Sequence, residues 1–529
     1  MSYQIHLDLT KRLSLVQLIG VVAASVIVLN LIIFTARGIY NVYIHPLRRV
    51  PGPKWSAFSE LQYCRTLLQG NMIQELKNLH GRYGPVVRVA PNEVSFASVD
   101  SWKTIYGFKA GQKEGYEKDM HFFPPPINGT RGIIIATGSD HGQQRRVFSH
   151  AFSDSALRDQ QPLITKYVDI LLDRLHEQVD SPGKGVVDFC MWYNYLTFDV
   201  IAELSFGESF HCLENAKLHP LIVLIFAALK ATTFNNAQQR LSWLKFLVGF
   251  FVPIKVLRQR KDLKEFVHAR VTKRLASDVA RSDFLTPASG MGKAKALEFP
   301  KIVSTSVVFM IAGSETTATT LSASTYLALR HPPVWEKLVK EVRSSFESVS
   351  DISFETVTSR LPYMLAVLNE TLRLYPPIPT GFGREVPEGG DMISGYFIPR
   401  KASFSWSISE LECSVVNNHV RHPCTLLSTS STDLQNIFEI LRNSTLRDGL
   451  EQRSIKMTIL QPSILSPLAP AAAWERTVVE MRLALAKLLW SFEMELLEDT
   501  AGQWMRDQKL YTLWDKPPLK VRLTRAERL

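Results

Sequence analysis

The motif Ala312-Gly313-Ser314-Glu315-Thr316-Thr317 lies inside a long apolar segment from about Ile302 to Leu329. The spacing of apolar residues in that segment predicts a helix. A glycine and hydroxyl residues in mid-helix weaken the hydrogen-bond ladder, because hydroxyls can bond back to carbonyls and open or bend the helix. Such a bend makes room for a small ligand, and an acid beside an alcohol there can relay protons through water. An ordinary buried helix that tolerates small residues is the alternative on this motif alone.

A second motif, Glu370-Thr371-Leu372-Arg373, is followed by Leu374-Tyr375-Pro376-Pro377. Glu370 and Arg373 are three residues apart, so on a helix they share one face and can pair. Surface pairs of this kind are common, and the spacing alone says little. The helix is expected to stop at the two prolines. Beyond Arg384, the run from Val386 to Pro399 predicts a turn between two short strands.

The remaining sequence predicts a mainly α fold with small β-sheets. From about Leu157 onward, apolar residues recur at helical spacing, for example in Leu163–Glu177 and Phe198–Ser205. Earlier in the chain, Val86–Val89 and Val94–Ala97 have the composition of short strands between proline and glycine breaks. We detect no internal repeat in the sequence.

The N-terminal region contains an uncharged run from Leu13 to Ala36, long enough to cross a hydrocarbon layer of about 30 Å as a helix. A cleaved signal peptide or a buried core helix is the alternative, but the run is too long for a typical signal and has no clear cleavage site. We therefore predict a lumenal segment at 1–12, a transmembrane helix at 13–36, a stiff, non-helical, proline-rich connector at 37–60 and one large domain at 61–529. Basic residues flank both ends of the run, so the positive-inside rule leans only slightly toward a cytosolic domain.

The composition, 46% hydrophobic and 21% charged, is that of a globular protein. The five cysteines, Cys64, Cys190, Cys212, Cys413 and Cys424, are odd in number and lack metal-like spacing. This pattern indicates a reducing compartment and no disulfide framework. The net charge of +11 suits an acidic protein partner or an anionic membrane surface. We expect no nucleic-acid partner, because no basic helix interleaved with aromatic residues is present.

Taken in order, these motifs resemble those of the cytochrome P450 monooxygenases, and most of all the fungal, microsomal, isotrichodermin-hydroxylase-like branch. The similarity extends to five further stretches, namely Tyr83–Pro91, Asp140–Arg146, Ser149–Phe152, Glu480–Trp490 and Trp514–Leu519. It covers the chain from the N-terminal anchor to the C-terminus, except for residues 401–476. The resemblance implies a cytochrome P450 fold behind an N-terminal transmembrane helix.

The resemblance also implies a haem b cofactor and assigns residues to its distal side and to its propionates. Ala312 and Gly313 would face the distal side of the haem, and Glu315 with Thr316 would form the acid–alcohol pair for oxygen activation. Arg145 and Arg384 would bind the haem propionates, where a guanidinium suits a carboxylate. For Arg145, a solvated helix charge is the alternative.

Three further residues receive roles from the same resemblance. His141 lies where relatives often have a tryptophan, four residues before the first of these arginines, and would contact a propionate. Glu370 and Arg373 would lock their helix to the loop that carries the iron ligand.

The implied reaction inserts one oxygen atom from O2 into a lipophilic small molecule of fungal secondary or xenobiotic metabolism. Electrons would come from NADPH through a separate, membrane-bound reductase, and the cofactor would carry the difficult chemistry. The substrate pocket should be apolar, with residues His121–Ile135 as a lining loop. The implied location is the endoplasmic reticulum membrane, with one membrane pass and the catalytic domain facing the cytosol.

The chain departs from the family at the iron ligand, because it contains no F-x-x-G-x-R-x-C-x-G motif. A haem monooxygenase needs a thiolate on iron. Cys413 and Cys424 lie too early and lack the glycine and arginine framing, so both are expected to be ordinary thiols and we assign no metal ligand. The expected place reads Leu465–Arg476. Shifted by one base, with permitted synonymous codons, this stretch can encode Phe-Ser-Phe-Gly-Pro-Arg-Gly-Cys-Leu-Gly-Lys-Asn, with the cysteine where Ala472 and Ala473 stand.

We therefore expect residues 401–476 to be translated in the wrong frame or from a retained intron, through an error in the gene model. A true lesion in a decaying gene is the alternative. In the literal chain this segment should pack poorly, because nothing in it was selected for the core. The alternative function is a membrane-tethered, inactive homologue that cannot ligate haem iron through a thiolate. An unrelated helical membrane protein would require every ordered motif to be coincidence.

Overall fold

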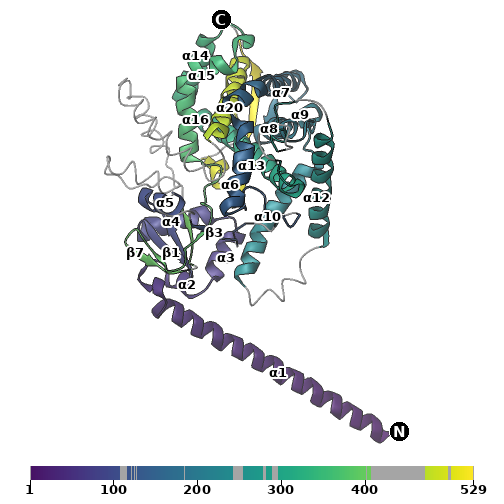
Figure 1. Ribbon diagram of the computed structural model, residues 1–529, viewed down its shortest axis with the longest axis vertical. Helices are drawn as coiled ribbons and strands as arrows, with labels where there is room; N and C mark the ends of the chain where they lie inside the picture. The colour runs from purple at the N-terminus through teal and green to yellow at the C-terminus, as the bar shows by residue number, and fades with distance from the viewer. Residues whose placement is uncertain are drawn as a thin grey trace.

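The computed structural model describes residues 2–107, 116–120, 122–123, 126, 128–183, 185–241, 254–277, 281–288, 296–400, 402–406, 471–497 and 502–527. These residues form a predominantly helical body with small sheets, from which one long helix projects (Figure 1). The expected fold class is therefore confirmed.

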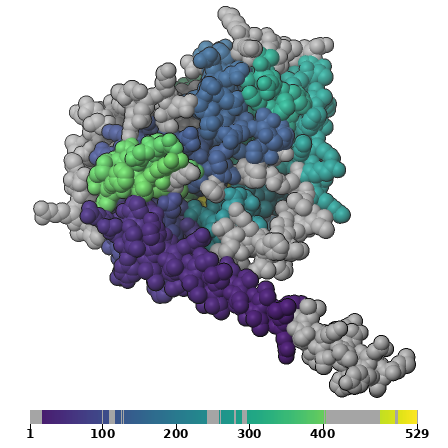
Figure 2. All heavy atoms as spheres, turned by 60° about the horizontal axis from the view of Figure 1, so that its bottom comes forward, coloured from purple at the N-terminus to yellow at the C-terminus, as the bar shows by residue number. Residues whose placement is uncertain are grey.

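The projecting helix, α1, runs from Ser2 to Tyr43. The most apolar 18-residue window of its part from Gln17 to Tyr43 has a mean hydropathy of 2.6, and no residue of that window is buried. Figure 2 shows this part of α1 extending beyond the rest of the molecule. An exposed helix of this length and composition suggests a membrane anchor. Helix α10, Pro220–Arg240, also passes the length and hydropathy test, but a third of its window is buried in the body.

The connector after the anchor differs from the expected non-helical spacer. Helix α1 continues to Tyr43, and a 3-10 turn at Pro46–Arg49 and helix α2 at Lys54–Phe58 follow. Gly38 explains why the helix docks here, because a Cβ at this position would collide with the ring of Phe58. The helix end is thus packed on the domain, since only a glycine permits this close approach.

The body nearest the anchor contains a five-stranded sheet in the order β1-β2-β8-β5-β3. The strands are β1 Val86–Ala90, β2 Glu93–Phe96, β8 Ser403–Trp406, β5 Arg384–Glu385 and β3 Glu117–Lys118. Beside it lie the hairpin β6 Asp391–Ile393 and β7 Tyr396–Ile398, and the helices α3 Leu61–Leu68, α4 Met72–Tyr83 and α5 Val99–Tyr106. The parallel pairing of β2 with β8 brings two segments about 300 residues apart into one sheet.

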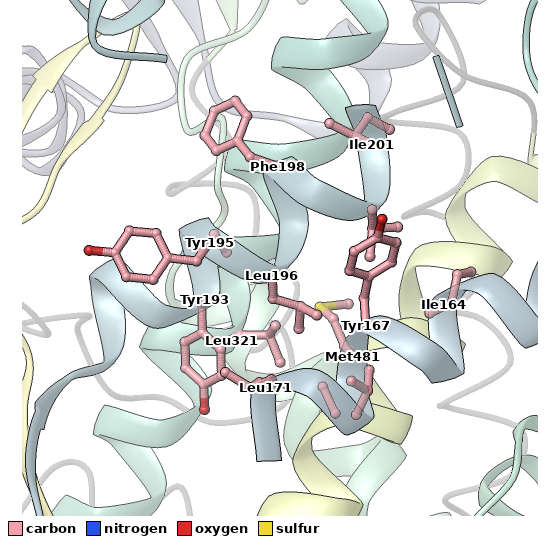
Figure 3. Packing of buried hydrophobic residues seen from close by; sticks show 14 of the residues in the cluster. Ile164, Tyr167, Leu171, Tyr193, Tyr195, Leu196, Phe198, Ile201, Leu321 and Met481 are labelled. Atoms are coloured by element: carbon pink, nitrogen blue, oxygen red, sulfur yellow. The ribbon is translucent and has the colours of Figure 1, made fainter. Parts of the chain in front are cut away.

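The large core surrounds helix α13, Phe299–Arg330, which packs along α8, Phe189–Phe206. Figure 3 shows Leu321 of α13 and Met481 of α20 among the side chains of α7 and α8. A buried hydrogen bond of 2.7 Å joins the hydroxyls of Tyr193 and Thr325 across the two central helices. The other helices are α6 Gly138–Ser149, α7 Asp154–Asp180, α9 Cys212–Asn215, α12 Ile254–Leu275, α14 Pro332–Ser345, α15 Phe354–Arg360, α16 Pro362–Leu374, α20 Ala471–Ser491 and α21 Gln503–Arg506.

The C-terminal residues return to this core. Strand β12, Lys520–Arg525, lies between β4, Val186–Asp188, and β9, Phe492–Leu496. Strands β10, Lys509–Tyr511, and β11, Leu513–Asp515, form a separate hairpin. As a result, the segment before β12 reaches α8 and α13 from the far end of the chain.

The segment expected to be misframed is only partly described. Ala402 is buried and Ser403–Trp406 forms β8, whereas residues 407–470 lie outside the described residues. Helix α20 begins at Ala471, so Ala472 and Ala473 lie in its first turn. The packing predicted for the whole of 401–476 remains a prediction.

Candidate functional site

The hydroxyl residues of α13 bond back to the helix as the sequence predicts. Ser314 Oγ donates to Met310 O at 2.5 Å, and Thr316 Oγ1 donates to Ala312 O at 2.5 Å. Thr317 Oγ1 makes the same bond to Gly313 O at 2.9 Å. The helix nevertheless runs without a break from Phe299 to Arg330, so the structure does not show the expected opening.

The two faces of α13 differ at this motif. Ala312 is exposed, and Gly313 and Thr316 are half-buried. Ser314 and Glu315 are buried in the core, with exposed fractions of 0% and 2%. Residues four apart on a helix lie on one face, so Ala312 and Thr316 form one surface that points away from the core. The predicted acid–alcohol pair is therefore adjacent in sequence but divided between two faces.

Glu315 has partners from its own helix and from the C-terminal segment. Its Oε1 accepts a hydrogen bond from Thr319 Oγ1 at 3.1 Å and forms a buried ion pair with Lys516. Its Oε2 is buried and has no hydrogen-bond partner among the described residues. Sequence reasoning did not find Lys516 as a partner, because it lies 201 residues further along the chain.

Four basic side chains form a second cluster, called here the basic cluster: Lys118, His141, Arg145 and Arg384. Lys118 of β3 lies directly opposite Arg384 of β5 in the antiparallel pair. His141 and Arg145 are four apart in α6 and share one face of that helix. Like charges placed opposite each other across strands destabilise a sheet. A bound anion would reduce this repulsion between Lys118 and Arg384.

The electrostatics of the basic cluster show its excess of positive charge. Burial, helped by the charges of Lys118, Arg145 and Arg384, lowers the pKa of His141 to about 4. Burial, with the charges of Arg384 and Arg131, lowers the pKa of Lys118 to about 7. Burial also lowers the pKa of Arg384.

The basic side chains find few partners inside the protein. Lys118 Nζ donates to the carbonyls of Ile134 and Ala136, at 2.9 and 2.6 Å. Arg384 lies over the ring of Tyr106, 5.5 Å from its centroid. Among the described residues, neither Arg145 nor Arg384 forms an ion pair with a carboxylate. The unpaired guanidinium groups are suited to the carboxylates of a bound molecule.

The predicted pair on α16 is formed. Arg373 Nε and Nη2 donate to the two carboxylate oxygens of Glu370, at 2.8 and 2.6 Å. Both side chains are nearly buried, with exposed fractions of 10% and 12%. The start of α16 is held by Glu341, whose carboxylate accepts the backbone N–H groups of Tyr363 and Met364. The loop to which this pair should lock the helix lies outside the described residues.

The expected lining loop, His121–Ile135, is described in part. Phe122 and Phe123 pack on Phe382, with ring centroids 5.9 and 6.0 Å apart. Further along, Ser304 of α13 donates to Asn128 Oδ1 at 2.7 Å and so ties the loop to the central helix. His121 itself lies outside the described residues.

The described cysteines are core residues. Cys64, Cys190 and Cys212 are buried and free, and burial raises the pKa of each thiol to about 12. A thiol with so high a pKa is not a ready thiolate ligand. Cys413 and Cys424 lie outside the described residues.

Comparison with known proteins identifies the family. The sequence profile described as Cytochrome P450 matches residues 49–412. The chain belongs to the cytochrome P450 family. It is 38% identical over 521 residues to the cytochrome P450 monooxygenase lcsI of Purpureocillium lilacinum, covering 96% of this chain and 95% of that protein. It is 37% identical over 490 residues to the averantin hydroxylase of Dothistroma septosporum, covering 92% of this chain and 88% of that enzyme.

Membership of the cytochrome P450 family implies an oxidoreductase with haem iron, and the described residues fit this cofactor on two sides. The basic cluster offers unpaired cations to the two haem carboxylates. The face of Ala312, Gly313 and Thr316 offers small side chains to a flat ring. On the third side, no thiolate ligand is present among the described residues, since Cys64, Cys190 and Cys212 all lie in the core.

Lys118 is a member of the basic cluster that sequence reasoning missed. It lies in a strand of two residues, Glu117–Lys118, which leaves no periodic signal. Only the pairing of this strand with β5 brings the lysine beside Arg384.

Proposed function

We propose that the intact form of this cytochrome P450 is a haem-thiolate monooxygenase of fungal secondary metabolism that hydroxylates a lipophilic small molecule. The basic cluster is the observation that carries the proposal, because two partly buried arginines without acidic partners among the described residues suit a dicarboxylate cofactor. The similarity to an averantin hydroxylase supports an oxygenation reaction. The aromatic contacts of Phe122, Phe123 and Phe382 support an apolar substrate.

In this proposal the cofactor, when bound, activates molecular oxygen, and the chain's residues position it and deliver protons. Arg145, Arg384, His141 and Lys118 hold its carboxylates. Ala312 and Gly313 leave space on the distal side. The hydroxyl of Thr316 holds a proton on that side, and Glu315 supplies protons from the opposite face of the same helix through water. Glu370 and Arg373 hold α16 against the ligand loop.

The proposed location is the endoplasmic reticulum membrane, with α1 as a single anchor and the domain in the cytosol. The exposed, apolar α1 supports the anchor. Electrons would come from NADPH through a separate reductase, and the net charge of +11 suits an acidic protein partner of this kind.

The ligand loop is proposed to be lost because residues 401–476 are translated in the wrong frame or from a retained intron. The match to the family profile ends at residue 412, which supports a foreign segment after that point. If the lesion is real, the printed chain is instead an inactive, membrane-tethered homologue. Transcript sequence across codons 400–480 decides between these two readings.

The first prediction concerns the ligand. A protein with the restored frame, reduced under carbon monoxide, should show the Soret shift of thiolate-ligated haem, because its other contacts with the cofactor are present. The printed chain should show no such band, since none of its described thiols is a ready thiolate. A thiolate band from the printed chain, or none from the restored protein, contradicts the proposal.

The second prediction compares two hydroxyls of α13 in the restored protein. Thr316→Ala should leave the carbon monoxide spectrum nearly unchanged and reduce product formed per O2 consumed, roughly 10-fold or more, because the hydroxyl acts in proton delivery. Ser314→Ala removes the same type of hydroxyl-to-carbonyl bond from the buried face and serves as the matched control. Equal loss of coupling in both variants would contradict a specific role of the Thr316 hydroxyl in proton delivery.

A further inference from the structure

A buried ion pair joins the centre of α13 to the C-terminal segment. Lys516 Nζ binds Glu315 Oε1 and donates to Thr319 Oγ1 at 2.8 Å, while Thr319 donates to Glu315 at 3.1 Å. The exposed fractions are 4% for the lysine and 2% for the glutamate. A lysine is almost never buried this completely unless it is paired.

The backbone around Lys516 is fixed on several sides. We call residues 513–519 the C-terminal strap. Trp514 Nε1 donates to Pro376 O at 2.9 Å, just beyond the end of α16. Pro517 O accepts Trp504 Nε1 at 2.9 Å and Cys190 Sγ at 3.5 Å. The strap therefore connects α16, α8 and α13, and it leaves the ammonium group little freedom to move.

The two carboxylate oxygens of Glu315 are in different situations. Oε1 is held by Lys516 and Thr319, whereas Oε2 is buried without a partner in the described part of the chain. A buried carboxylate oxygen is rarely left without a donor, and an ordered water commonly fills that role. A water bound to this oxygen would lie on the buried face of α13, in the helix turn that also contains Thr316.

We propose that Lys516 is a positioning residue for proton delivery: it fixes Glu315 through Oε1 and leaves Oε2 to hold a buried water beside the turn of Thr316. This inference rests on the proposed monooxygenase function. Lys516 acts only through Glu315 and does not touch the cofactor or the substrate. Its effect should appear in coupling and not in cofactor binding.

The main test uses the frame-restored protein and measures product formed per O2 consumed. Lys516→Met should lower this ratio roughly 10-fold, with an unchanged carbon monoxide spectrum, because the acid loses its fixed position. Lys516→Arg keeps the charge and should restore most of the ratio. The matched control is Asp515→Asn, because this neighbouring strap residue is half exposed and pairs with Lys230 at the surface. Unchanged coupling in Lys516→Met, with a normal spectrum, overturns the role of Lys516 alone.

A double variant guards against misfolding of the single one. Lys516→Met leaves a buried carboxylate without its partner, which can unfold the protein. Glu315→Gln/Lys516→Met removes both charges and should couple as poorly as Glu315→Gln alone, because the lysine acts only through the acid. A further loss in the double variant would assign Lys516 an independent role and overturn the proposal.

A second readout uses the printed chain and needs no cofactor. Cys190 contacts the strap through Pro517, whereas Cys64 and Cys212 are buried elsewhere. Lys516→Met should speed labelling of Cys190 by a thiol reagent roughly 10-fold or more, because the strap loses a buried pair, and should leave the other two thiols unchanged. Mass spectrometry identifies the labelled site. Unchanged labelling of Cys190 means that the pair does not hold the strap, while absence of the thiolate band in the restored protein separately overturns the proposed function.

Discussion

Arg240 and Arg384 are both partly buried, and their charges are compensated in opposite ways. Arg240 of α10 pairs with Glu60 at 3.1 Å and Glu93 at 2.5 Å, and its guanidinium lies 3.9 Å from the ring centroid of Tyr63. Arg384 of β5 instead lies opposite Lys118. In the part of the chain that the structure describes, no carboxylate pairs with Arg384.

The pKa of each arginine reflects this difference. Burial lowers the pKa of Arg240, but the charges of Glu93, Tyr63 and Glu60 together more than offset it, and the net shift is upward. Burial lowers the pKa of Arg384, and the charge of Tyr106 offsets the shift only in part. A charge that is paired inside the chain stabilises the fold. A charge that is left unpaired raises the energy of the empty protein and stabilises a bound anion.

The largest expected effect comes from breaking the paired group. Arg240→Met should destabilise the protein by about 3–5 kcal/mol, because it leaves Glu93 buried without its partner. Urea unfolding of the anchor-containing chain in detergent measures the change. A loss below about 1 kcal/mol, the range of an exposed pair, would remove the contrast between the two groups.

A surface pair provides the control for this experiment. Lys230 and Asp515 lie 2.7 Å apart with about half of each side chain exposed. Because water screens this pair, Lys230→Met should change the free energy of unfolding by no more than about 1 kcal/mol. A large loss in the control would show that methionine itself is poorly tolerated in these positions.

A smaller effect is expected for Arg384. Its removal should not destabilise the chain without haem, but it should weaken haem binding in the restored protein. Arg384→Gln should leave the printed chain equally stable or more stable by up to about 1 kcal/mol, because it removes a like charge opposite Lys118. In the frame-restored protein the same change should speed haem transfer to apomyoglobin roughly 10-fold, because a charge-assisted hydrogen bond is lost. Destabilisation of the printed chain by several kcal/mol would mean that Arg384 is a structural residue.

The smallest effect is a dependence of stability on pH. The pKa of Lys118 is lowered from 10.5 to about 7 in the folded chain. Between these two values the unfolded chain binds more protons than the folded chain, so this group makes the free energy of unfolding rise with pH. Below pH 7 Lys118 is charged in both states, and its full destabilising effect on the folded chain is then present. Because the side chain is only partly buried, solvent screening should keep the slope below that of one full proton.

Comparison with Lys118→Met isolates this slope from the other titrating groups. Melting temperatures of the two proteins from pH 7 to 10 should converge as the pH rises. In the restored, haem-loaded protein the difference should shrink, because an anion beside Lys118 favours its charged form. Parallel curves would show that the lysine is not under strain from its neighbours.

Elements with local causes could be predicted from the order of residues alone. Apolar spacing predicted the helix that became α13, and the prolines at 376 and 377 predicted the end of α16, which stops at Leu374. The strand pair β6 and β7 followed from its turn residues, where Ser394 and Gly395 adopt positive φ angles. The absence of the cysteine motif could also be recognised from the sequence, because the residues of that motif are contiguous.

Which charged side chains contact each other could be seen only in the folded chain. Lys118 and Arg384 come together through pairing of two short strands, and Glu315 meets Lys516 because the chain returns to the core near its end. The docking of Gly38 on Phe58 likewise needed the packed helix. Local periodicity depends on neighbours in the sequence, whereas these contacts depend on how distant segments pack. That packing gives Arg240 its acidic partners and leaves Arg384 without one among the described residues.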